Sequence, residues 1–378
     1  MRSDSVVKRV LFPYVGDSVG GSHISSTLLI SHLDPERYQA VVLLQQEGPL
    51  EDLLARMGLA YQITPLPELA GGVPRITSIV RAELRSLPAA LSLLRHNDIA
   101  LVHTNDLRMH LTWFMPAWFS GRRWIWHQRM LLSQSPLWRL LPFAAARIFC
   151  ISKAVQDTLP THRNVPSDVL YNPIEVDVED EDQRSRLLEE IKAPVDALIF
   201  GFVGNMTMQK RPNIFIEAAA LMMKQSGAPL NFVLFGDNRG GMREHTEDLA
   251  RTRGIADRVH FMGHRIPIEP WISALDFLLA PGVGDGFGRT LVEAMLSGTP
   301  VIAADSGGHP EIIEHEVTGL LFLPDHPNAL AGAAMELLNN PSKAMAMKNI
   351  AREYAINTFS ANHHAEQVMS AYDGVAES

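Results

Sequence analysis

The chain has 378 residues, of which 46% are apolar and 20% are charged. These proportions are close to the average for globular proteins and exclude disordered, collagen-like and disulfide-scaffold classes, and the length favours two domains. The net charge of −9 has the wrong sign for a surface that follows nucleic acid, so we expect no nucleic-acid partner. The single cysteine, Cys150, fits a reducing compartment, and we expect a cytoplasmic protein.

The sequence predicts neither a signal peptide nor a membrane-spanning helix. The apolar run Val10–Tyr14 is too short for the core of a signal peptide. The longest uncharged apolar stretch, Met109–Gly121, stays below the roughly 18 residues that a spanning helix needs.

In the first half of the chain, short apolar runs typical of strands alternate with helical patterns. The expected strands are Lys8–Tyr14, Gln39–Leu44, Ile99–His103, Trp124–His127 and Arg147–Ile151, and the expected helices are Ser22–Leu33, Leu50–Met57, Arg75–Arg95 and Lys153–Leu159. This alternation is typical of a doubly wound parallel sheet in an α/β domain.

The second half repeats the pattern after a break at Tyr171–Ile174 and a run of six acidic residues within eight positions, 175–182, which indicates a linker or a helix start. The expected strands are Leu198–Val203, Leu230–Phe235, Val259–Met262, Phe277–Ala280, Val301–Ala304 and Leu320–Phe322; the expected helices are Pro212–Gln225, Met242–Arg253, Arg289–Ser297, Pro327–Asn339 and a final pair after Pro341. We therefore predict two domains, residues 1–174 and 175–355, which face each other across a cleft, and a carboxyl-terminal helix, residues 356–378, which packs back on the first domain.

Two turns carry candidate binding residues after the first strand of each domain. Gly20 and Gly21 precede a helix, where bare backbone amides can meet an anionic or hydroxyl-rich ligand, although such a pair can also serve only as a tight turn. Lys210 and Arg211 precede the helix at Pro212, where two cations oppose the helix dipole. A bound anion would remove that conflict; the alternative is two solvated charges.

The glycine-rich stretch from Pro281 to Ile313 is the most informative. Four glycines leave the backbone amides of residues 285–288 uncovered before a helix, so a diphosphate could lie at its N-terminus. Glu293, one turn further, offers two acceptor oxygens for the vicinal hydroxyls of a ribose. The alternative for Glu293 is a surface ion pair with Arg289.

These motifs, in this order, resemble glycosyltransferase family 4, the retaining GT-B enzymes of the glycosyl transferases group 1. The resemblance rests on Gly20-Gly21, Asn172-Pro-Ile-Glu175, Gly204 to Lys210, Phe235-Gly-Asp237, Gly263-His264, Asp285-Gly-Phe-Gly288, Glu293-Ala-Met, Gly298-Thr-Pro-Val-Ile-Ala and Gly307-Gly-x-x-Glu311. It covers most of the chain and is strongest from Gly201 to Phe322.

The resemblance implies transfer of a sugar from a nucleoside-diphosphate sugar, with UDP- or GDP-linked donors expected, to a hydroxyl of a glycan, lipid-linked or small-molecule acceptor, with retention and without a metal cofactor. The catalytic group would be His127 beside the reacting sugar, Lys210 on the diphosphate and Asp285 near the sugar hydroxyls. The donor-binding residues would be Gly20, Gly21, Asn205, Lys210, Arg211, Gly263, His264, Arg265, Asp285, Gly286, Phe287, Gly288, Leu291 and Glu293. The alternative for His127, as an isolated strand-end histidine, is a purely structural role.

Two departures from the family pattern keep an alternative open. Asp285 stands where the family usually has Glu, and Asn205 stands where it usually has Arg. We expect Arg211 to supply the missing cation. The alternatives are a non-catalytic GT-B subunit that binds a nucleotide sugar or a partner and, more remotely, a nucleotide-sugar epimerase.

The fifteen histidines show no metal-ligand spacing, and His309 to His315 and the pair His363-His364 are expected at the surface. The segment Leu107–Gln156 has no acidic residue, seven basic residues and five of the six tryptophans. This mixture predicts a peripheral contact with an anionic membrane, on the inner face if the protein is cytoplasmic; the alternative is a tryptophan-rich core.

Overall fold

The computed structural model describes residues 7–66, 76–133, 138, 140–160, 165–176, 182–238 and 241–376. The chain divides into two compact units. Unit 1 comprises residues 1–173 and 361–378, and unit 2 comprises residues 174–360. The division therefore falls after 173 and after 360, where the sequence predicted boundaries after 174 and after 355. Residues 177–181 of the expected acidic linker lie outside the described residues.

Unit 1 contains a seven-stranded parallel sheet with the strand order β3-β2-β1-β4-β5-β6-β7. The strands are β1 (Lys8–Tyr14), β2 (Tyr38–Leu44), β3 (Tyr61–Ile63), β4 (Ile99–Thr104), β5 (Arg123–Gln128), β6 (Arg147–Cys150) and β7 (Ser167–Val169). The helices are α1 (Gly21–Ser31), α2 (Pro49–Arg56), α3 (Ile76–His96), α4 (Leu107–Ser120), the 3-10 helix η1 (Leu141–Ala144), α6 (Lys153–Gln156) and α15 (Ala361–Ala376).

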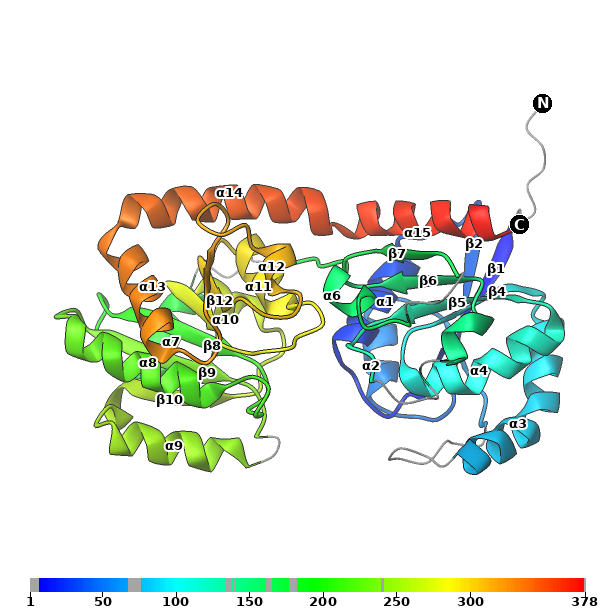
Figure 1. Ribbon diagram of the computed structural model, residues 1–378, viewed down its shortest axis with the longest axis horizontal. Helices are drawn as coiled ribbons and strands as arrows, with labels where there is room; N and C mark the ends of the chain where they lie inside the picture. Colours follow the sequence, from blue (N-terminus) through cyan, green and yellow to red (C-terminus); the bar gives the residue numbers. More distant parts are fainter. Residues whose placement is uncertain are drawn as a thin grey trace. The chain divides into compact units, whose positions relative to one another are not determined.

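The last helix, α15, completes the core of unit 1. Its residues Val368, Met369 and Tyr372 are buried in one cluster with side chains of β1, β2, α1 and α2. Figure 1 shows α15 running beside the strands of this sheet. The first part of unit 1, residues 1–173, therefore needs a segment from beyond unit 2 to cover one face of its sheet.

Unit 2 contains a six-stranded parallel sheet with the order β10-β9-β8-β11-β12-β13. The strands are β8 (Leu198–Val203), β9 (Leu230–Phe235), β10 (Val259–Gly263), β11 (Phe277–Ala280), β12 (Val301–Ala304) and β13 (Leu320–Phe322). The helices are α7 (Gln183–Glu190), α8 (Pro212–Gln225), α9 (Met242–Thr252), η2 (Ala256–Arg258), α10 (Glu269–Ser273), α11 (Arg289–Leu296), α12 (His309–Ile312), α13 (Pro327–Asn339) and α14 (Pro341–Phe359).

The predicted architecture of two doubly wound parallel sheets is confirmed. The elements that were not predicted are α4, α10, α12, the 3-10 helices η1 and η2 and the three-residue strands β3 and β7. Helix α7 begins at Gln183, directly after the acidic run for which a helix start was one of the two expectations. Helix α4 carries ordinary end signals, because the Asp106 carboxylate accepts the backbone N–H of Met109 and Gly121 ends the helix with a φ of 68°.

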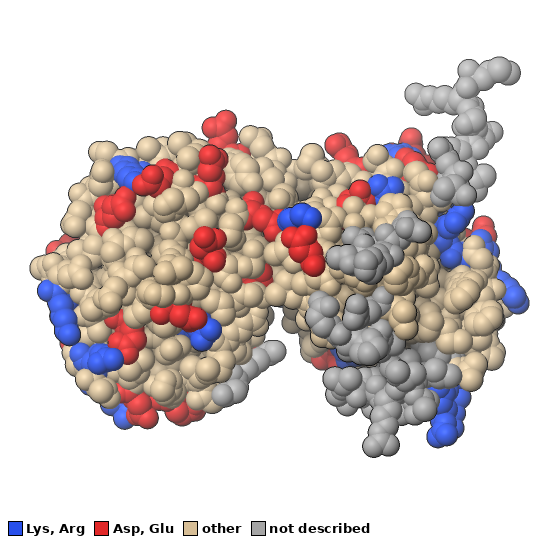
Figure 2. Space-filling view, in the orientation of Figure 1, with Lys and Arg blue, Asp and Glu red and all other residues tan. Residues whose placement is uncertain are grey.

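The strand order reverses beside the first strand of each sheet. In unit 1, β2 and β4 lie on opposite sides of β1 in the sheet. In unit 2, β9 and β11 lie on opposite sides of β8. In doubly wound sheets, ligands bind outside the carboxyl ends of the strands at this point. Figure 2 shows charges of both signs scattered over one face of the two units, without a large field of one sign.

Candidate functional site

The switch point of unit 2 brings together Lys210, which follows β8, and Asp285, which follows β11. The Lys210 Nζ lies 2.7 Å from the Asp285 Oδ2, and the side chains keep 30% and 13% of their exposure. The two residues are 75 positions apart in sequence, and the order of the strands places them side by side. Two of the residues predicted to be catalytic thus meet at the edge where a ligand is expected.

His309 is a third member of this group. Its Nε2 lies 3.3 Å from the Asp285 Oδ2, and its Nδ1 lies 3.0 Å from the backbone carbonyl of Ala304. Burial opposes ionisation of Asp285, but the hydrogen bond with His309 and the charge of Lys210 outweigh it and hold the pKa of that carboxyl at about 2. The expectation that His309 lies at the surface is wrong, because it is only 1% exposed.

The glycines Gly307 and Gly308 explain how the Asp285 loop is held. A Cβ on Gly307, whose φ is +60°, would lie 2.2 Å from the carbonyl oxygen of Asp285, and a Cβ on Gly308 would lie 2.8 Å from Phe287 atoms. Only glycine permits this approach, and the N–H of Gly308 donates to the Asp285 carbonyl at 2.9 Å. The backbone of Gly307 and Gly308 therefore packs against the loop that carries Asp285, Gly286, Phe287 and Gly288 and holds it in place.

Glu293 lies in α11, one turn beyond its N-cap Gly288. It is 6% exposed, and its Oε1 lies 3.3 Å from an Arg289 nitrogen. Burial raises the pKa of Glu293, and the Arg289 charge partly offsets the effect. The ion pair with Arg289, which was the alternative for Glu293, is therefore present, but it is buried and not at the surface. Leu291 of the same helix is also buried.

The cation expected to replace the missing arginine is already paired. Arg211 occupies the N-cap of α8 with a left-handed φ of 55°, and its guanidinium lies 3.2 Å from an oxygen of Asp325. Asn205 accepts the N–H of Asp237 at 3.4 Å. Lys210 and Asn205 thus follow β8 at the switch point, whereas Arg211 is directed to the segment after β13.

The residues expected to face the base lie after β10. Gly263 has a φ of 69°, and the His264 Nδ1 lies 3.2 Å from Asp237 at an exposed position. Arg265 pairs with Glu190 at 2.5 Å and its guanidinium lies 4.7 Å from the Trp271 ring centroid. Strand β10 is two strands from β8 in the sheet, so these residues flank the switch point.

At the switch point of unit 1, Gly20 is the N-cap of α1 and Gly21 its first residue. The N–H of Gly20 donates to the His23 Nδ1 at 3.1 Å, so one amide of the turn is occupied. Burial and the nearby Arg108 charge lower the pKa of His23 to about 4. Arg108 itself forms a bidentate ion pair with Asp17, which lies in the same turn as Gly20.

His127 is the penultimate residue of β5 and is fully buried. Its Nδ1 lies 3.1 Å from the His103 Nε2 and 3.2 Å from an Arg129 nitrogen. Its ring stacks at 6.0 Å on His364, which is 2% exposed and not at the surface as expected. Burial and the Arg129 charge hold the pKa of His127 well below its ordinary value. His103 and Arg129 were not among the predicted site residues, although His103 belongs to the neighbouring strand β4.

The tryptophan-rich segment is mainly core. Trp113, Trp124 and Trp126 are at most 2% exposed, which favours the tryptophan-rich core for most of the segment. Trp118 and Phe119 are the exception, because they are 71% and 63% exposed at the end of α4. Arg139 lies outside the described residues.

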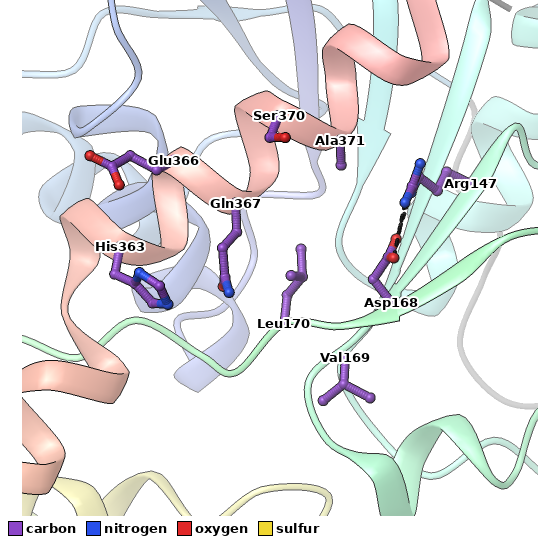
Figure 3. Close-up of a pocket in the computed structure, with 9 residues that line it drawn as sticks. All are labelled: Arg147, Asp168, Val169, Leu170, His363, Glu366, Gln367, Ser370 and Ala371. Atoms are coloured by element: carbon purple, nitrogen blue, oxygen red, sulfur yellow. Dashed lines mark hydrogen bonds and ion pairs between the residues drawn. The ribbon is translucent and has the colours of Figure 1, made fainter.

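A groove of about 620 Å³ lies in unit 1 between α15 and the strands β6 and β7. Figure 3 shows the ion pair of Arg147 and Asp168 on one side and Glu366 and Gln367 of α15 on the other. Its lining extends from Arg147, the first residue of β6, to Leu170, which follows β7, and none of the predicted site residues lines it.

Within the described ranges, no group of three or more His, Cys, Asp or Glu residues is placed to hold a metal ion. No helix in the same part of the chain is both long and apolar enough to cross a membrane.

Two doubly wound sheets with these switch points define the GT-B class of fold. The Anabaena protein HepE, crystallised with UDP and glucose, superimposes with a TM-score of 0.82 over 97% of this chain and 100% of its own, at 21% identity. A glycosyltransferase of Rickettsia africae superimposes with a TM-score of 0.83 over 98% of both chains, at 15% identity. Likeness at these identities establishes the fold.

Residues 197–340, the greater part of unit 2, match the family model of the glycosyl transferases group 1. The predicted likeness to this family is confirmed for that part of the chain. A glycosyltransferase of Methanocaldococcus jannaschii is 27% identical over 62% of this chain and 61% of its own, and the D-inositol 3-phosphate glycosyltransferase of Corynebacterium kroppenstedtii is 35% identical over 46% and 39%. The matches thus span less than two thirds of these relatives.

Proposed function

We propose that the protein transfers a sugar from a nucleoside-diphosphate sugar to a hydroxyl of a glycan, lipid-linked or small-molecule acceptor, with retention of the anomeric configuration. The observation that supports this most is the group of Lys210, Asp285 and His309 at the switch point of unit 2, within the part that matches the family model. The complex of HepE with UDP-glucose supports a UDP-linked donor.

Lys210 is our candidate for the diphosphate. Departure of a nucleoside diphosphate builds negative charge on its β-phosphate, so a fixed cation stabilises the transition state more than the ground state. One N–H of the ammonium is used by Asp285, which leaves two for phosphate oxygens. The loop from Asp285 to Gly288 would add backbone donors at the N-terminus of α11.

The two buried carboxylates would have different ligands. Glu293, in α11, is our candidate for the ribose hydroxyls, and Gly263, His264 and Arg265 for the base. Asp285, ionised by its contacts with His309 and Lys210, is our candidate for the hydroxyls of the sugar.

A panel of nucleotide sugars tests the proposal. We expect one donor to raise the melting temperature and to be slowly hydrolysed to free sugar and nucleoside diphosphate, with NMR of the released sugar giving the anomeric outcome. Binding without hydrolysis or transfer would instead support the non-catalytic subunit. No binding of any nucleotide or nucleotide sugar would refute the proposal.

For the acceptor, we propose a lipid-linked molecule and docking of unit 1 on an anionic membrane. The exposed Trp118 and Phe119 lie in the last turn of α4, and Arg122 and Arg123 follow the helix after Gly121. Helix α4 contacts η1, where Phe143 is 44% exposed. Aromatic side chains beside arginines are typical of membrane-interface contacts.

A further inference from the structure

Four polar residues form a chain of hydrogen bonds inside unit 1. Tyr372 of α15 hydrogen-bonds through its hydroxyl to the Nδ1 of His103 in β4. The Nε2 of His103 lies 3.1 Å from the Nδ1 of His127, and a terminal nitrogen of Arg129 lies 3.2 Å from the same atom. Tyr372, His103 and His127 are each fully buried.

Arg129 decides the direction of these bonds. A guanidinium donates and cannot accept, so the Nδ1 of His127 that faces it must carry a lone pair. The Nε2 of His103 faces this lone pair as well and must therefore be a donor. Both distances exceed the common 2.9 Å, as expected when two donors share one acceptor.

The proton positions of both rings follow. Burial and the Arg129 charge hold the pKa values of His103 and His127 well below the ordinary value, so both rings are neutral. A neutral His103 with its proton on Nε2 accepts at Nδ1, which is where the Tyr372 hydroxyl donates. A neutral His127 that accepts at Nδ1 carries its proton on Nε2.

The Nε2 of His127 has no hydrogen-bond partner among the described residues, although it is buried. The neighbouring Asn105 is in the same state: its Oδ1 accepts from two Arg129 nitrogens at 2.8 and 3.0 Å, and its Nδ2 has no partner in that part of the chain. Buried polar groups are normally paired in proteins, so two unpaired donors point to acceptor atoms of a ligand.

We propose that Tyr372, His103 and Arg129 are positioning residues that hold His127 in the Nε2–H form, so that His127 and Asn105 present N–H donors to hydroxyl oxygens of a bound sugar or acceptor. Arg129 is anchored by the carbonyl of the Asn172 side chain at 2.6 Å, so the set of donors is held by β4, β5, α15 and the end of unit 1. The sugar as ligand rests on the proposed function; the proton positions do not.

The first test uses the full-length wild-type protein labelled with ¹⁵N-histidine, without any ligand. Two-bond ¹⁵N–¹H spectra distinguish the two neutral tautomers and the imidazolium, and single histidine substitutions assign the signals. At pH 7 we expect His103 and His127 both neutral and protonated on Nε2. A proton on Nδ1 of His127, or an imidazolium at either ring, would overturn the inference.

The second test compares Tyr372→Phe with Tyr38→Phe. Tyr38 lies in the same cluster, its ring 5.2 Å from that of Tyr372, and its hydroxyl donates to Asp373 of the same helix at 2.6 Å, outside the chain of bonds. In Tyr372→Phe we expect His103 to keep its proton on Nε2, because Arg129 still fixes the lone pair of His127, but the ¹⁵N shift of its Nδ1 to change with the loss of the hydroxyl donor. We expect kcat to fall about 2- to 10-fold, the effect of one hydrogen bond, with the donor KM unchanged.

In Tyr38→Phe we expect the wild-type Nδ1 shift of His103 and the wild-type kcat. A wild-type Nδ1 shift of His103 and a wild-type kcat in a folded Tyr372→Phe protein would refute a role for Tyr372. Correct tautomers without any sugar transfer would contradict the proposed function and leave the assignment of the protons intact, so the two failures are distinguishable.

Discussion

Replacement of Lys210 by methionine separates two roles of one ammonium group. The Lys210 Nζ lies 2.7 Å from an Asp285 carboxylate that is only 13% exposed, and the same group is our candidate for the diphosphate. We expect Lys210→Met to lower turnover about 10²–10³-fold, the usual loss for one donor to a developing negative charge. We also expect a loss of about 1–3 kcal/mol in the free energy of unfolding, because a buried carboxylate loses its charged partner.

The double variant Lys210→Met, Asp285→Asn tests this division. Without the buried negative charge, most of the lost stability should return, because the amide needs no counter-charge. Turnover should stay low, because no cation faces the phosphate. Urea unfolding followed by circular dichroism gives the stability, and release of nucleoside diphosphate gives the turnover.

Lys343→Met is the matched control in the same unit. Lys343 also pairs with carboxylates, those of Glu316 and Glu336, but these are exposed and far from β8 in sequence. We expect wild-type turnover. Near-wild-type turnover of Lys210→Met would refute the role on the diphosphate, and recovered turnover in the double variant would show that Lys210 serves only to neutralise Asp285.

Three further outcomes are expected. In calorimetry, Glu293→Gln should weaken free nucleoside diphosphate and intact donor alike, whereas Asp285→Asn should weaken only the donor; equal losses for both ligands in both variants would mean the two carboxylates are misassigned. Arg122→Glu with Arg123→Glu should abolish salt-sensitive co-sedimentation with anionic vesicles and leave donor hydrolysis unchanged, and no binding of the wild type at low salt would favour a non-membrane acceptor. Unit 1 should lose stability on acidification, because the pKa of His23 is about 4 in the folded protein and has the ordinary value of 6.5 in the unfolded chain. Below pH 6.5 the unfolded chain therefore binds a proton that the folded protein does not, and at pH 5 the free energy of unfolding is lower by about 2 kcal/mol per such histidine. A melting temperature that is flat from pH 7 to 5 would contradict it.

The architecture was predictable because both halves repeat the same alternation and their strands are buried on both faces, so they read as continuous apolar runs. Strand ends are also where the chemistry lies, and this led to Lys210 and Asp285. The three-residue strands β3 and β7 were missed because so short a segment has no period to detect.

The contacts around those residues were not predictable. Nothing in local spacing places His309 against Asp285, since the approach depends on Gly307 and Gly308 packing under a different loop. Likewise His103 meets Tyr372 across 269 positions. From its neighbours in sequence alone, a histidine is predicted to be exposed because its ring is polar. Whether it is buried depends on elements from elsewhere in the chain that pack against it.

The return of α15 to unit 1 has a consequence for how the chain folds. Unit 2 is one continuous segment and can form from its own residues, whereas unit 1 is interrupted by all of unit 2. Until residues 361–376 leave the ribosome, the apolar face of the first sheet that receives Val368, Met369 and Tyr372 stays uncovered. Bringing α15 back to the first sheet closes a long loop, and the entropy that this costs is offset only by the contacts that α15 makes at the end. Unit 1 is therefore synthesised first but completes its native core last.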